Sequence, residues 1–168
     1  MRRGIASNFN VDMSFNPTEI ASMLKEYEAD HNTGIDISDI SNKIYDYTSG
    51  YPFFVSRICK CIDEEFGKDW TIEGVETAIK RILAENNEVF DTINKILENN
   101  KDIYNLVIKL LVPDNFVLFS YGVPEIDLAD SIGIIKRKGN GSSRTIISNK
   151  IFEMFLRNYA VPIKLSKT

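Results

Sequence analysis

The chain has 168 residues, of which 43% are hydrophobic and 26% charged, and these values fit a globular protein with a core rather than a disordered or fibrous one. No apolar run approaches the roughly 20 residues that cross a bilayer, and Met1 to Gly4 lead into polar sequence, so we expect a cytoplasmic protein. The net charge of −4 conceals an asymmetry: residues 1 to 98 carry 10 Lys and Arg against 18 Asp and Glu, whereas residues 99 to 168 carry 10 against 6. This charge break predicts two units with different neighbours.

The first helix has a specific start signal. Residues 4 to 15 alternate weakly in hydrophobicity and predict a short strand or an extended lead. Asn16 then suits a helix cap, Pro17 suits the first helical position, and the side chain of Glu19 can reach back to the cap. Apolar residues follow at helical spacing, and Gly34 suits the stop.

Four more amphipathic helices follow in the acidic part of the chain. The second carries isoleucines between Ile37 and Ile44 and ends on Gly50, and the third runs from Pro52 to Phe66. Thr71 caps a fourth helix, and a fifth ends near Asn99. We therefore predict a helical bundle over residues 16 to 98 and a domain boundary at its end.

The cysteines and the histidine do not predict a metal site or a disulfide. Cys59 and Cys61 are two residues apart in a helical pattern, which directs their side chains to nearly opposite faces. His31 is the only histidine, and zinc needs more ligands than these three residues supply. We expect reduced cysteines that pack, and no bound metal.

The basic part of the chain alternates helices with short β-rich runs. A helix is predicted over residues 101 to 112, a β-rich run at 116 to 119, and a short helix over 124 to 130. Gly139-Asn140-Gly141 forms a turn between two β-branched runs, which is a hairpin signal, and Ser148 or Asn149 caps the last helix. This order is that of a winged helix. The predicted fold class is therefore mainly α, with a helical bundle followed by a winged-helix domain over residues 99 to 168.

The sequence lacks the common local signatures of catalysis. It contains no Gly-x-x-x-x-Gly-Lys loop for phosphates, no Gly-x-Ser-x-Gly elbow, no His-Glu-x-x-His helix and no Gly-x-Gly-x-x-Gly turn. We expect a chain that is not itself an enzyme. Carboxylates that pair only in space are the weaker alternative, because 24 acidic residues also suit an ordinary solvated surface.

Three segments resemble the C-terminal half of bacterial AAA-like ATPases of the STAND and archaeal ATPase groups. They are residues 10 to 20, Tyr47 to Val55 and residues 146 to 153. The resemblance implies a helical lid, whose Gly-x-Pro turn lies near the adenine, followed by a winged helix. It also implies that residues 1 to 15 are the end of an ATPase core, and that the phosphate loop and the magnesium-binding strand precede Met1. ATP and magnesium are then expected only for the full-length relative.

The same resemblance assigns nucleotide-lid candidates. It puts Gly50 and Pro52 at the nucleotide edge of the lid with Tyr51 beside them, and it lets Arg57 approach phosphates. The alternative for the turn is ordinary helix punctuation, since glycine ends helices and proline begins them. The alternative for Arg57 is an exposed helix arginine.

Cations near the predicted hairpin suggest a second kind of partner. Lys136, Arg137, Lys138 and Arg144 fall within nine residues and could lie along a nucleic-acid backbone. Against this, the helix over residues 124 to 130 carries three acids, which repel phosphate. The expected function is a regulatory module that contacts the missing ATPase core or another protein, with self-association as a further option. The alternative is a stand-alone winged-helix DNA-binding protein whose bundle dimerises.

Overall fold

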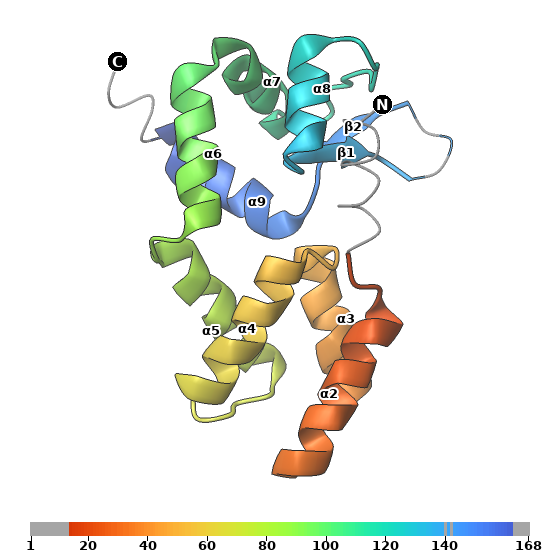
Figure 1. Cartoon of the computed structure of the whole chain (residues 1–168), viewed down its shortest axis with the longest axis vertical. Coiled ribbons are helices and arrows are strands. Elements are labelled where there is room, and N and C mark those ends of the chain that lie inside the picture. Colours follow the sequence, from red (N-terminus) through yellow and green to blue (C-terminus); the bar gives the residue numbers. More distant parts are fainter. Residues whose placement is uncertain (1–13, 140, 142, 163–168) are drawn as a thin grey trace. The chain divides into compact units, whose positions relative to one another are not determined.

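The computed structural model describes residues 14–139, 141 and 143–162, and these are mainly helical with one small antiparallel sheet (Figure 1). The helices are α2 (Pro17–His31), α3 (Ile37–Thr48), α4 (Pro52–Glu64), α5 (Ile72–Ala84), α6 (Glu88–Asn99), α7 (Lys101–Leu111), α8 (Pro124–Ser131), α9 (Lys150–Phe155) and the π-helix η1 (Leu156–Ala160), and the strands are β1 (Ile135–Arg137) and β2 (Thr145–Ile147). The predicted fold class of a helical bundle with a small hairpin is confirmed. The expected core remnant at residues 1 to 15 lies largely outside the described residues.

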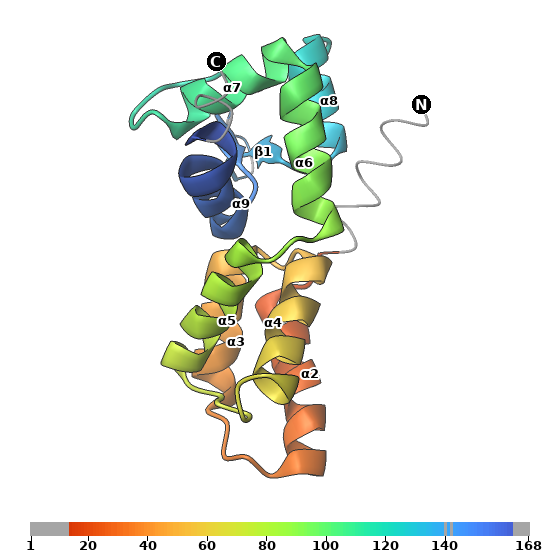
Figure 2. The ribbon, with the colours of Figure 1, turned by 90° about the vertical axis from the view of Figure 1, so that its left-hand side faces the viewer.

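The contacts divide the chain into two compact units, of which the first contains α2 to α5 and the residues 149 to 151. Within it, α3 packs against α2, α4 and α5, so that the four helices lie side by side (Figures 1 and 2). Its buried apolar side chains include Ile20, Leu24, Ile40, Ile44, Phe54, Val55, Ile58, Ile62, Val75, Ile79 and Ile82. These residues are the apolar stripes of the four helices, which explains why the amphipathic pattern gives a bundle.

The helix starts follow the local signals, whereas one predicted stop is wrong. Asn16 and Glu19 form the expected reciprocal capping box, and the Thr71 side chain accepts from the backbone N–H of Gly74. Helix α2 ends at His31 rather than at Gly34, because Asn32 takes the left-handed conformation with φ of 49°. Asparagine tolerates that conformation better than most residues, and it closes the helix two residues early.

The second unit contains α6 to α8, both strands and residues 152 to 162. The strands pair with Ile135 opposite Ile147, and α7 packs against α6, α8 and β2. Helix α6 belongs to this unit: its Phe90 stacks on Phe155 with ring centroids 3.9 Å apart. The division therefore lies one helix before the boundary predicted at residues 98 and 99, since buried aromatic packing and not the change of charge determines where α6 packs.

The predicted β-rich run at residues 116 to 119 forms a single bridge, between Leu118 and Arg144, rather than a strand of its own. Both cysteines are free thiols, as expected, and burial raises the pKa of Cys59 to about 12. None of the described helices is both long and apolar enough to cross a membrane.

Candidate functional site

The turn between α3 and α4 is built around a close backbone approach. The backbone N–H of Phe15 donates to the carbonyl oxygen of Gly50 at 2.9 Å, and a Cβ placed on Gly50 would lie 1.8 Å from the carbonyl oxygen of Phe15. Gly50 has φ of 79°, and its N–H donates to Oγ1 of the buried Thr48 at 3.0 Å. Two independent features therefore require glycine at this position: the left-handed backbone conformation and the lack of space for a Cβ.

The residues after Gly50 open α4 with an aromatic surface. Tyr51 precedes the helix, Pro52 occupies its first turn, and no described side chain caps that turn. The Phe54 ring is fully buried, and the rings of Tyr51 and Phe53 pack against it at 5.1 and 5.6 Å between centroids. Tyr51, Pro52 and Phe53 are each only partly buried. Of the four predicted lid candidates, the structure brings Gly50, Tyr51 and Pro52 together in one turn.

Arg57, the fourth lid candidate, is bound to acidic residues rather than exposed. Its Nε and Nη2 donate to the two carboxylate oxygens of Glu85 at 2.9 and 2.6 Å, and Glu65 lies 3.4 Å from Nη2. The hydrogen bonds to Glu85 hold the pKa of Arg57 above its usual value. An approach of this guanidinium to a phosphate would require a two-bond ion pair to open.

The four cations near the hairpin do not form one exposed row. Successive strand residues point to opposite faces, so Lys136 and Arg137 of β1 lie on different faces. Lys136 is half-buried, and this burial lowers its pKa. The guanidinium of Arg144 donates to the carbonyl oxygen of Asn115 at 3.3 Å.

Arg137 lies over two aromatic rings beside an acidic helix. Its guanidinium carbon is 5.0 Å from the Phe119 ring centroid and 5.8 Å from that of Tyr121. Burial, together with the nearby Asp127 carboxylate, raises the pKa of Asp130 of α8, and the charge of Arg137 offsets part of this rise. This packing gives Arg137 a structural role in addition to its charge.

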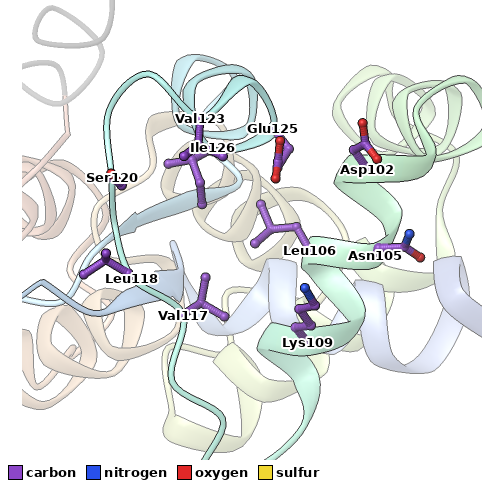
Figure 3. Close-up of a pocket in the computed structure, with 10 residues that line it drawn as sticks. All are labelled: Asp102, Asn105, Leu106, Lys109, Val117, Leu118, Ser120, Val123, Glu125 and Ile126. Atoms are coloured by element: carbon purple, nitrogen blue, oxygen red, sulfur yellow. The ribbon is translucent and has the colours of Figure 1, made fainter.

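A groove that the sequence did not predict lies within the second unit, between α7 and α8. It has a volume of about 380 Å³ and is bordered by α7, the segment 117–123 and the first turn of α8 (Figure 3). Leu106 and Ile126 form its floor and are 5% and 3% exposed. The only sequence signal for it is that Asp102, Asn105 and Lys109 recur at helical spacing on one face of α7. We call this feature the α7/α8 groove.

Charged groups lie at both ends of the α7/α8 groove. Figure 3 shows Asp102 and Glu125 toward one end of the groove, on α7 and α8, and Lys109 toward the other end. Among the described residues, none of these three groups has an ion-pair partner within 4.0 Å. The part of the chain that the structure describes also holds no group of three His, Cys, Asp or Glu placed to bind a metal. The groove offers charged groups toward both ends and an apolar floor.

No protein-family model matches the chain, and comparisons with curated proteins and with solved structures found no similar protein.

Proposed function

We propose that this chain is the non-catalytic lid and winged-helix portion of an AAA-like ATP-binding protein, and that it transmits the nucleotide state of a core lying outside these 168 residues. The observation that carries the proposal is the turn at Gly50. Its backbone approaches Phe15 so closely that no side chain fits, and it presents Tyr51 and Pro52 at the start of α4. The Gly-x-Pro turn that lies near the adenine in the ATPases this chain resembles has the same residue order.

The second unit supports the winged-helix part of the proposal. The order α7, segment 117–119, α8, β1, β2 and α9 follows the order predicted for residues 99 to 168 and supports the proposal. Segment 117–119 bonds to the β2 side of the hairpin through Thr145 N–H to Val117 O at 2.8 Å. DNA binding by this domain is the less favoured function, because Lys136 and Arg144 are partly buried and Arg137 lies on aromatic rings.

The genomic DNA gives the first test. We expect the region upstream of the Met1 codon to encode a Gly-x-x-x-x-Gly-Lys motif, either in frame or in the adjacent gene, because the proposed lid needs a phosphate-binding core. Unrelated upstream sequence would contradict the proposal.

Pro52→Ala is expected to weaken nucleotide binding in the protein that joins the core to this chain. We expect about a tenfold higher Kd for a fluorescent ATP analogue, equivalent to about 1.4 kcal/mol, from loss of a rigid contact beside the base. Pro17→Ala is the matched control, since Pro17 also occupies the first turn of a helix in the same unit. Equal Kd values for the two variants in a fluorescence titration would contradict a nucleotide role for this turn.

A further inference from the structure

The segment 117–119 is hydrogen-bonded along one edge only. Phe119 N–H donates to Ser143 O at 2.6 Å and Thr145 N–H donates to Val117 O at 2.8 Å. Because backbone groups of successive strand residues alternate in direction, the N–H and C=O of Leu118 point away from β2. Neither group bonds to any residue that the structure describes. The segment therefore presents a free strand edge.

The free edge borders the α7/α8 groove and carries exposed apolar side chains. Leu118 and Ser120 line one side of the groove and α7 lines the other (Figure 3). Leu118 is 55% exposed and Phe116 is 62% exposed. An unpaired edge beside apolar side chains is a template for the addition of another strand. A chain laid in the groove would meet backbone donors and acceptors on one side and the apolar floor beneath.

The charged residues of the groove indicate which side chains a bound peptide should carry. Asp102 and Lys109 are seven residues apart on α7, a rise of about 10 Å along the helix axis. Residues four positions apart in an extended peptide share a face and lie about 13 Å apart, a span close to this rise. A basic side chain beside Asp102 and Glu125 would thus place a residue four positions away on the same face near Lys109, where an acidic side chain or a terminal carboxylate is complementary.

We propose that the α7/α8 groove binds an extended segment of a protein partner, which adds as a strand to the free edge at Leu118. The segment places an apolar side chain on Leu106 and Ile126, a basic residue near Asp102 and Glu125, and an acidic group near Lys109. This site is independent of the nucleotide role proposed for the Gly50 turn, since all of its residues belong to the second unit.

The test uses a displayed library of random ten-residue peptides selected against the whole chain. We expect enriched sequences with alternating apolar residues, and a Lys or Arg four positions from an acid, so that both charges share a face of the added strand. Binding of the best synthetic peptide is then measured by fluorescence anisotropy. Failure to enrich any sequence, or enrichment without the basic residue, would overturn the proposal.

Two substitutions at Leu118 separate backbone pairing from side-chain contact. Leu118→Pro removes only the outward N–H and leaves both bonds to the β2 side in place, and proline is tolerated on such an edge. We expect at least tenfold weaker peptide binding for Leu118→Pro and at most a threefold loss for Leu118→Ala. Equal binding by both variants would show that no strand is added. A dimer in sedimentation that Leu118→Pro converts to a monomer would assign the edge to a second copy and overturn the partner proposal.

A charge exchange keeps the proposal testable if Leu118→Pro does not fold. Asp102→Lys with Glu125→Lys should weaken binding of the basic peptide at least tenfold, and a peptide with Glu in place of its basic residue should recover it. Asp91→Lys is the matched control, because Asp91 is an exposed acid in the first turn of α6. A similar loss in the control, or no recovery, would mean that the charges at the groove do not recognise the peptide.

Discussion

Gly50→Ala is expected to destabilise the first unit by about 3 kcal/mol or more. An alanine there adopts a left-handed backbone, which costs about 1 to 3 kcal/mol, and its Cβ also meets the Phe15 carbonyl oxygen at 1.8 Å. The nearest atoms to this Cβ are all backbone atoms of Phe15, so no flexible side chain can move aside to relieve the clash. Urea denaturation followed by the fluorescence of Trp70, the only tryptophan, reports on this unit because Trp70 is buried in it.

Gly34→Ala is the matched control for this experiment. Gly34 has the same φ of 79°, but nothing lies within 4 Å of the position of its Cβ. Its substitution should therefore cost only the same backbone strain of about 1 to 3 kcal/mol. The difference between the two variants measures the close approach of Phe15, and equal losses would mean that the approach contributes nothing to stability.

Glu85→Gln is expected to destabilise the first unit by about 2 kcal/mol. The substitution leaves the guanidinium of Arg57 without its main counter-charge. Both side chains are largely buried, Arg57 at 21% and Glu85 at 11% exposed, so water compensates the unpaired charge only in part. Loss of one partner of a buried pair costs about 3 to 5 kcal/mol, and the partial exposure of this pair reduces that value. Urea denaturation monitored by Trp70 fluorescence measures the effect.

The Lys43–Glu76 pair gives the control for this second prediction. It lies in the same unit at 3.1 Å, but Glu76 is 44% exposed, so Glu76→Gln should cost less than about 1 kcal/mol. If Arg57→Met restores most of the stability lost in Glu85→Gln, the loss arises from the unpaired guanidinium. A cost for Glu85→Gln no larger than that for Glu76→Gln would contradict the assigned role of the pair.

Local signals predicted the helices because their causes are local. The capping box at Asn16 and Glu19 forms between groups three residues apart, and Thr71 reaches an N–H at the same spacing. The apolar stripes likewise follow from the helical period, and most of their residues are buried. The end of α2 was mispredicted because both Asn32 and Gly34 suit a left-handed residue, and the sequence does not rank them.

The candidate site was predicted in part. Gly50 and Pro52 marked the turn in the sequence. Glycine is common just after the end of a helix and proline at the first position of the next, and both preferences belong to the residue itself. The partner of Arg57 was not predictable, because Glu85 is 28 residues away and only the packing of α4 on α5 brings the two together. The α7/α8 groove was missed for the same reason, as its walls come from three separate segments.

The sequence alone therefore determined the helix starts, the hairpin, the position of the glycine turn and the absence of the common catalytic motifs. These depend on contacts within a few residues or on residue identity. Tertiary structure decided which unit receives α6, why Gly50 has no room for a side chain, which acid binds Arg57, and that Leu118 borders a groove. Each of these depends on packing between segments distant in sequence, whose geometry no local pattern encodes.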